Sequence, residues 1–425
     1  MDQISGAEAR VLDAIDENAL VENLVSLIQI PSVTGTEAES EIQAWQAQLL
    51  TEIGFNVDHW KIDIDEMAAH PDFPGTEAPR TEGYGTVGVY GSTSEPPALI
   101  LQGHIDVVPT GDLNNWEDRN PWSGAIKNNA VHGRGACDMK AGVAANLAVA
   151  RAIVSSGVKL KRSLAVHSVI SEEDGGLGAF ATMLRGHCGD SAVISEPTSG
   201  KLVVANAGAL TFQLRVHGLA THGSSRLAGY SAINAFLPIY AAIAKLEKVR
   251  NLRADPLFDG NPLPYPISVG TIHTGDWASS VPDLLVAEGR LGVILDEEPT
   301  VAKAAFQRAI DDTCSKDLWL SDHPVSVSWP GGQFASGRTS TDHTLVHEIS
   351  DAIRLIENRD VLLGAAPYGS DLRLYAGMGG IPTLHYGPGD VRLAHGPREQ
   401  VDITELISTT RSLALLAARR CGAYL

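Results

Sequence analysis

The residues best suited to chemistry are histidines and carboxylates that follow short apolar runs. The first run, residues 99–106, reads Leu-Ile-Leu-Gln-Gly-His-Ile-Asp and predicts a buried strand that ends with His104 and Asp106. Alternation along a strand puts these two side chains on one face. A neutral imidazole is a common metal ligand, and a neighbouring carboxylate commonly fixes its tautomer. An isolated pair of this kind is more often structural, so a metal site needs further ligands.

Three more motifs place carboxylates at the ends of predicted elements. Adjacent carboxylates at the end of a buried strand raise one another's pKa and are costly unless a cation lies among them. A solvated acidic turn is the alternative for such a motif when it stands alone. The motifs are Asp138, before the helix expected over residues 139–156; Glu172 and Glu173, after the strand expected over 163–170; and Glu196, after the strand expected over 191–195.

A second histidine, His395, lies on a loop that precedes the last predicted helix. Strands that end in a ligand, with helices between them, predict an open α/β sheet. In such sheets, sites lie in the crevice outside the carboxyl ends of the strands. The side chains expected to meet there are His104, Asp138, Glu173 and Glu196, with His395 as a second imidazole.

The composition bounds the class of protein. A chain of 425 residues favours two domains, and 44% hydrophobic with 20% charged residues is typical of a soluble globular protein. The net charge of -19 argues against nucleic acid and acidic membrane partners. Residues 1–17 lack the pattern of a secretory signal, and no apolar run approaches the roughly 20 residues that span a bilayer, so we expect a cytoplasmic protein.

The segment over residues 208–331 changes character. It begins with an alternating strand over residues 209–217, followed by a helix, two strands, a second helix and a final strand. This β-α-β-β-α-β order predicts an inserted α+β domain. We therefore expect an α/β catalytic domain, a mostly parallel sheet with helices on both faces, formed by residues 1–207 and 332–425. The insert would split this catalytic domain in sequence.

Two further expectations concern segments that surround the predicted sheet. Thr36 and Glu39 have the spacing of a capping box at the start of the second helix. Residues 70–84 are rich in proline and glycine, which predicts a long surface loop over a site.

Five of these motifs resemble those of the dinuclear-zinc deacylase and peptidase family. Its members include acetylornithine deacetylase, succinyl-diaminopimelate desuccinylase, aminoacylase and carboxypeptidase G. The motifs follow the family's order over nearly the whole chain. They are Gly-His104-Ile-Asp106-Val-Val-Pro, Gly-Arg-Gly-Ala-Cys-Asp138-Met-Lys, Glu172-Glu173-Asp-Gly-Gly, Glu196-Pro-Thr and His395-Gly-Pro-Arg-Glu399.

The resemblance implies two divalent metal ions per subunit, zinc first, with manganese or cobalt as alternatives. It implies Glu172 as the general base that helps a metal-activated water to attack a carbonyl, and Asp106 as the partner of the His104 ring. Relatives hold the peptide after the bridging aspartate in cis, so we expect Asp138–Met139 to be cis. The implied ligands are His104 and Glu196 on one ion, Glu173 and His395 on the other, and Asp138 bridging both.

The resemblance also extends to the insert, residues 208–331, and implies that this insert is a lid and dimerisation domain. His222 matches the lid-domain histidine that reaches the partner subunit's active site and hydrogen-bonds the developing oxyanion, which implies a homodimer through the insert. Arg290 and Arg373 could each bind a substrate carboxylate bidentately. An ordinary salt bridge is the alternative for both arginines.

The sequence therefore predicts a metal-dependent hydrolase that cleaves a linear amide of a small molecule, the N-acyl group of an amino acid or related amine. Glu196 is typical of deacylase members, whereas peptidase members tend to have aspartate there. Alternatives are a dipeptidase or carboxypeptidase, and a deformylase or aminohydrolase of a small aromatic or heterocyclic amine. An alternative of another class is a non-catalytic binding protein on the same fold.

Overall fold

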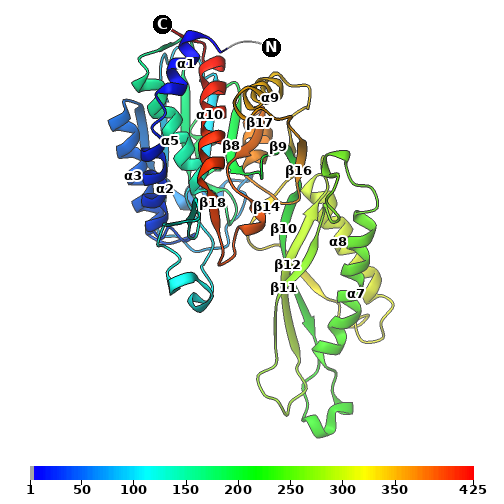
Figure 1. The fold of residues 1–425 in the computed structure, drawn as a ribbon. Helices are drawn as coiled ribbons and strands as arrows, with labels where there is room; N and C mark the ends of the chain where they lie inside the picture. Colours follow the sequence, from blue (N-terminus) through cyan, green and yellow to red (C-terminus); the bar gives the residue numbers. More distant parts are fainter. Residues whose placement is uncertain (1–3) are drawn as a thin grey trace.

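A computed structural model describes residues 4–425 of the chain, which form a larger and a smaller lobe (Figure 1). The larger lobe is built on a nine-stranded sheet and the smaller on a five-stranded sheet. Residues 1–3, which open the expected segment 1–207, lie outside the described residues. In the described chain, every helix is too short or too polar to cross a membrane.

The nine-stranded sheet is parallel at its centre and antiparallel at its edges. Its strands, in spatial order, are β1 (Asn56–Lys61), β2 (Tyr84–Tyr90), β7 (Leu164–Val169), β3 (Leu99–His104), β8 (Ala192–Pro197), β17 (Thr383–Gly387), β9 (Leu202–Asn206) and β15 (Gly337–Arg338), with β16 (Leu363–Ala366) also paired to β9. The four strands β7, β3, β8 and β17 run parallel. This confirms the predicted sheet and brings the carboxyl ends of three ligand-bearing strands to one edge.

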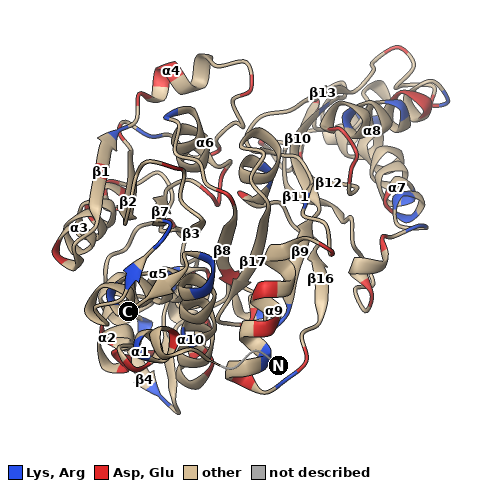
Figure 2. Ribbon diagram, turned by 90° about the horizontal axis from the view of Figure 1, so that it is seen from above, with Lys and Arg blue, Asp and Glu red and all other residues tan. Residues whose placement is uncertain are grey.

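Helices cover both faces of this sheet, as Figure 2 shows. Alternation along β3 explains why both faces need cover: Leu99 and Leu101 join the core under the long helices, whereas Ile100 joins Phe180 in the core of the other face. One face has α1 (Gly6–Asp13), α2 (Glu17–Gln29), α3 (Ala38–Ile53), α5 (Lys140–Ser155), α9 (Thr344–Glu357) and α10 (Ile403–Arg420); the other has α4 (Ile64–Ala69), α6 (Leu177–Leu184) and the π-helical turn η5 (Leu374–Met378).

The smaller lobe has the predicted β-α-β-β-α-β order. Its elements are β10 (Gly208–His217), α7 (Ala232–Arg250), β11 (Ile267–Thr274), β12 (Leu284–Val293), α8 (Pro299–Cys314) and β13 (Ser326–Ser328), with β14 (Gln333–Phe334) paired to β10. We call β10 to β13 the inserted lobe. Leu210, Phe212 and Leu214 alternate along β10 and pack with Phe306 of α8 and Ile239 of α7. Both helices therefore cover one face of this antiparallel sheet and leave the other open.

Short elements complete the described chain. They are β4 (Ala125–Lys127), β5 (Ala130–His132) and β18 (Gln400–Asp402), which form a three-stranded sheet; β6 (Lys159–Leu160) and β19 (Ala423–Tyr424), which form a two-stranded sheet; and the 3-10 turns η1 (Leu113–Asn115), η2 (Glu117–Arg119), η3 (Gly223–Ala228), η4 (Pro256–Phe258) and η6 (Val391–Leu393).

The start of α3 differs from the expectation. Its N-cap is Glu37, which makes no capping hydrogen bond with its side chain, and the Thr36 hydroxyl donates to the carbonyl of Val33 instead. The Glu39 carboxylate is buried and is bound by Arg80. The carboxylate also accepts from the N–H of Gly35 at 3.1 Å, rather than from that of Thr36. The predicted capping box is therefore wrong, because neither of its two reciprocal bonds forms between Thr36 and Glu39.

Candidate metal centre

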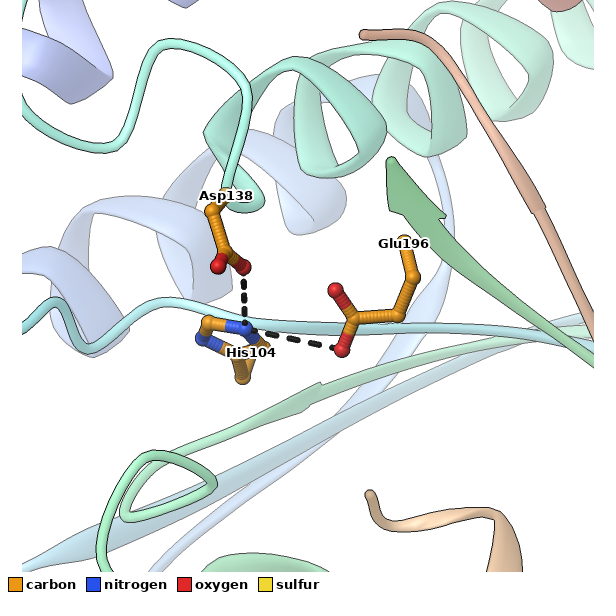
Figure 3. Close-up of side chains that lie close together, drawn as sticks. All are labelled: His104, Asp138 and Glu196. Carbon is orange, nitrogen blue, oxygen red and sulfur yellow. Dashed lines mark ion pairs between the residues drawn. The ribbon is translucent and has the colours of Figure 1, made fainter. Parts of the chain in front are cut away.

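Three side chains meet where β3, β8 and the start of α5 come together. His104 is the last residue of β3, Glu196 lies near the end of the parallel strand β8, and Asp138 precedes α5. The Nε2 atom of His104 lies 3.3 Å from Oδ1 of Asp138 and 3.6 Å from Oε1 of Glu196 (Figure 3). The peptide bond between Asp138 and Met139 is cis, as expected.

Asp138 also takes part in a second group, through its other oxygen. His395 Nε2 lies 3.3 Å from Asp138 Oδ2 and 3.2 Å from Glu173 Oε2. Within each of the two groups the potential ligand atoms lie within 4.8 Å of one another. The structure therefore brings together all five side chains expected to bind metal, in two groups that share Asp138.

The charges of these residues fit a site for cations. Among residues 4–425, the buried Nε2 of His104 and Oε1 of Glu173 lack a hydrogen-bond partner. Burial raises the pKa of Glu196, and hydrogen bonds to Asp138 and Glu173 raise the pKa of His395 to about 11. A divalent cation would replace the protons that these groups otherwise retain. Imidazole and carboxylate donors in this mixture suit first-row divalent ions, so the residues fit such a group.

The Asp106 carboxylate does not hydrogen-bond the His104 ring, in contrast to the expectation. The ring donates from Nδ1 to the main-chain carbonyl of Asp106 at 2.9 Å, and the nearest carboxylate oxygen is 3.6 Å away. The carboxylate instead accepts from the backbone N–H groups of Glu172 and Glu173, each at 3.2 Å, and from the Thr34 hydroxyl at 3.0 Å. Asp106 thus fixes the turn that presents the two glutamates.

Glu172 lies beside the two groups but belongs to neither. Its side chain is buried, and burial raises its pKa well above the ordinary value, with Glu196 and Asp371 adding to the rise. Proximity to His104 partly opposes this shift. A buried carboxyl group with a raised pKa, next to potential metal ligands, can take up and release a proton near neutral pH.

A buried ion pair that sequence analysis missed ties the loop of His395 to that of Asp138. Arg134 lies 2.5 Å from Glu399 and also donates to the carbonyl of His395 at 3.0 Å. Glu399 accepts from the backbone N–H groups of Cys137 and Asp138 at 3.2 Å. Arg134 and Glu399 lie within the motifs of Asp138 and His395, and this position in the sequence could have indicated their supporting role.

A hollow of about 290 Å³ lies between the cluster and the open face of the inserted lobe. Glu173 lines one side of it, and Arg290 of β12 lines the other. In the described chain Arg290 forms no ion pair, so it is available to an anion. Burial lowers the pKa of its guanidinium, and the nearby carboxylates of Glu172 and Glu173 partly oppose this shift. The ordinary salt bridge considered for Arg290 is therefore absent from residues 4–425.

Arg373 is placed differently. Its guanidinium is 4.0 Å from the ring centre of Phe334 and donates to the carbonyls of Ser370 and Gly175, at 2.8 Å and 2.6 Å. The residue is only 5% exposed, and burial lowers its pKa to about 10. Arg373 therefore binds the protein backbone through both of its terminal nitrogens. A substrate carboxylate could bind only to N–H groups of the guanidinium that these two bonds do not use.

His222 lies outside the cluster. It is exposed, and its Nδ1 is 2.7 Å from the Ser224 hydroxyl. β10 runs away from the large sheet in Figure 1, and His222 follows the far end of this strand. Within the described part of one chain, no hydrogen bond or ion pair links it to the candidate ligands.

Comparisons with known proteins agree with this arrangement. The pattern of peptidase family M20/M25/M40 matches residues 100–419. The N-formyl-4-amino-5-aminomethyl-2-methylpyrimidine deformylase of Bacillus subtilis is 26% identical over 416 residues, 92% of this chain and 91% of that protein. The acetylornithine deacetylase of Shigella sonnei is 28% identical over 415 residues, 92% and 94% of the two chains. The di-peptidase Dug1p from Saccharomyces cerevisiae has a TM-score of 0.77 at 14% identity, covering 98% of each chain.

Proposed function

The chain belongs to peptidase family M20/M25/M40, and from this membership and the geometry of the site we propose that it is a two-metal hydrolase of linear amides. The observation that carries the proposal is the pair of ligand groups sharing Asp138, with Glu172 beside them. We propose an N-acyl amino acid or a related N-acyl amine as the substrate.

Two divalent ions, zinc first and manganese or cobalt as alternatives, would complete the site. When bound, such ions polarise a carbonyl oxygen and make a water molecule more acidic. The residues that would hold one ion are His104, Glu196 and Asp138, and those for the other are Asp138, Glu173 and His395.

Glu172 is the proposed general base. Its carboxylate takes a proton from the attacking water and later returns it to the leaving nitrogen, which would otherwise depart as a poor anion. Burial suits both steps, because it raises the pKa of the group toward the working pH. Asp106 contributes by fixing the backbone on which Glu172 stands.

Arg290 supports a substrate that has a carboxylate next to the cleaved amide, because it lines the hollow and has no ion-pair partner among residues 4–425. The acetylornithine deacetylase and Glu196 favour deacylation of an amino acid. The deformylase relative favours a second candidate, hydrolysis of an N-formyl group on a heterocyclic amine. A panel of N-acetyl amino acids, an N-formyl aminomethylpyrimidine and dipeptides, assayed with each metal, separates the candidates.

Variants at the two adjacent glutamates test the mechanism. Glu172→Gln removes the proton acceptor but no proposed ligand, so turnover should collapse while metal content stays near two ions per subunit. Glu173→Gln should instead lose one ion, because an amide is a poor donor to a hard cation. Metal content and kcat, measured on both variants, distinguish the base from the ligand. Normal turnover in the Glu172→Gln enzyme would refute the proposal that Glu172 is the general base. A protein that binds no metal and cleaves nothing on the panel would favour the non-catalytic alternative.

A homodimer through the inserted lobe is the proposed assembly. Apolar side chains are exposed along one stripe of α7, at Ile233, Leu237 and Tyr240, and Trp277 is exposed between β11 and β12. Such a patch is typical of a surface that another protein covers. In this assembly His222 would complete the partner subunit's site.

Mixing subunits tests this assembly. The Glu172→Gln and His222→Ala variants should each be nearly inactive, since loss of one oxyanion donor costs about 10² to 10³ in rate. A heterodimer of the two has one site with both groups intact, so partial activity should return. If the subunits exchange and activity stays at the level of either parent, the shared site is refuted. The cytoplasmic location stays a prediction.

A further inference from the structure

We propose that Arg80 and Glu77 are positioning residues that fix the turn of Glu172 and lock it to the inserted lobe. Both belong to residues 74–80, which we call the bridging segment. This segment lies between the glutamate turn, residues 171–176, and the base of the inserted lobe. The inference rests on the proposed role of Glu172 and adds a physical link between that residue and the lobe.

At one end of the link, Arg80 binds the glutamate turn through Asp174. Its guanidinium contacts both oxygens of Asp174, at 2.8 Å and 3.1 Å, and both oxygens of Glu39, at 2.9 Å and 3.0 Å. The side chains of all three are at most 5% exposed. Paired, bidentate contacts in a buried site leave the guanidinium a single orientation. Arg80 therefore joins α3, the bridging segment and the turn.

The backbone of the bridging segment adds further bonds to the same carboxylate. Asp174 accepts from the N–H groups of Glu77 and Ala78, at 3.1 Å and 2.8 Å, and from the Ser171 hydroxyl. Only one residue separates Asp174 from Glu172. Any displacement of the bridging segment is therefore transmitted to the residue proposed as the base.

At the other end, the Glu77 carboxylate contacts the inserted lobe and the strand that leads out of it. Its Oε1 accepts from the Thr211 hydroxyl of β10 at 2.6 Å and from the N–H of Gly332 at 3.4 Å. The N–H of Gln333 in β14 donates to the carbonyl of Pro74 at 2.8 Å. The bridging segment is thus hydrogen-bonded to both chain crossings between the lobes.

Three glycines show how closely the backbones are stacked at this point. A Cβ atom on Gly175 would lie 1.9 Å from the carbonyl oxygen of Gly75, and one on Gly75 would lie 2.1 Å from that of Gly331. The glutamate turn, the bridging segment and the base of the lobe are therefore in direct contact, with no side chains between them to absorb movement. The position of the lobe and that of Glu172 are set together.

Amide hydrogen exchange measures this coupling without reference to activity. Thr211→Val removes the hydroxyl that binds Glu77, and we expect residues 171–176 to exchange about tenfold faster, the change that loss of one hydrogen bond to a charged acceptor allows. Glu77→Ala removes this bond and the longer one from the N–H of Gly332, so its effect should be at least as large. The double variant should not exceed Glu77→Ala, because Thr211 acts through the same carboxylate. Thr274→Val is the matched control: it removes a hydrogen bond to Leu284 inside the inserted lobe, and should leave residues 171–176 unchanged.

Kinetics test the other end of the link. Arg80→Lys keeps the charge but loses the paired geometry, so kcat should fall about 10- to 100-fold while KM and metal content change little. Unchanged exchange over residues 171–176 in Thr211→Val, or wild-type kcat in a folded Arg80→Lys enzyme, would overturn the inference. If Glu172→Gln is inactive while both of these variants behave as wild type, the proposed function stands and the link alone fails. If Arg80→Lys does not fold, the exchange measurement decides.

Discussion

Replacing Asp106 by Asn separates two accounts of how this carboxylate serves the site. The two carboxylate oxygens of Asp106 accept hydrogen bonds from the N–H groups of Glu172 and Glu173. Asn keeps one acceptor oxygen for one of these groups but points an NH2 donor at the other. A hydrogen bond to a charged acceptor contributes about 1.5 to 3 kcal/mol, and the surviving bond becomes a weaker neutral one. Relief of charge in an acidic cluster offsets part of this loss. We therefore expect the free energy of unfolding to fall by about 2 kcal/mol.

Activity should fall further than metal binding in this variant. The turn of Glu172 loses its anchor, so kcat should drop about 10- to 100-fold. The His104 ring keeps its bond to the main-chain carbonyl of residue 106, so the ion proposed at His104 and Glu196 should remain. Urea unfolding, kcat and metal content per subunit check the three expectations.

The control for this variant is Thr34→Val, which removes only the hydroxyl that donates to Asp106. It should lower the free energy of unfolding by a similar amount, about 1.5 kcal/mol, but have a much smaller effect on kcat, because the N–H groups of Glu172 and Glu173 keep their acceptor. Selective loss of one ion in Asp106→Asn, with normal turnover when metal is restored, would refute this account. The carboxylate would then act through His104, as the sequence suggested.

Three other outcomes follow from the described contacts. Arg290→Ala should raise KM about 10- to 100-fold for substrates with a carboxylate and little for their carboxamide analogues, in steady-state assays of both; equal effects would contradict carboxylate binding. Gly142→Ala should lower the free energy of unfolding by about 3 kcal/mol, because its Cβ would lie 1.9 Å from the carbonyl of Ser195, whereas Gly377→Ala, with open space around it, should be tolerated in the same denaturation experiment. In metal-free protein, the pKa of His395 is raised from 6.5 to about 11, and the pKa values of His104 and Glu196 are also raised. The folded form then binds more protons than the unfolded form, so the contribution of His395 is complete below pH 6.5 and lost as the pH approaches 11. Thermal melts of chelated protein should thus shift down between neutral pH and about pH 9, more than those of metal-loaded protein; the opposite shift would contradict this reasoning.

The metal centre could be predicted because its parts follow local rules. Each apolar run ends in a ligand, and parallel strands bring their carboxyl ends to one edge, so His104 and Glu196 had to meet. The order of the motifs was specific enough to identify the family, and its match over residues 100–419 confirms that resemblance. The strands and helices of the inserted lobe follow alternation and helical spacing, which are also local signals.

The supporting contacts could not be predicted because they join segments that are distant in sequence. Glu39 has the spacing of a capping residue, yet Arg80 from an irregular segment binds it. For Arg373 a substrate carboxylate and an ordinary salt bridge were the two alternatives, but its guanidinium donates to the backbone carbonyls of Gly175 and Ser370. Hydrophobic periodicity does not indicate such contacts, because each depends on the three-dimensional course of a loop.

The position of β17 in the sheet has a consequence for how the chain is made. β8 and β9 are consecutive in sequence, but β17, about 180 residues later, lies between them. Until the ribosome has released residues 383–387, the large sheet lacks a central strand, and His395 follows later still. The inserted lobe is continuous in sequence and can form earlier, as domains generally do during synthesis. The nascent chain can therefore form this lobe before it has a site that can bind two metals, and a premature stop before residue 383 would leave the large sheet without β17 and the site without His395.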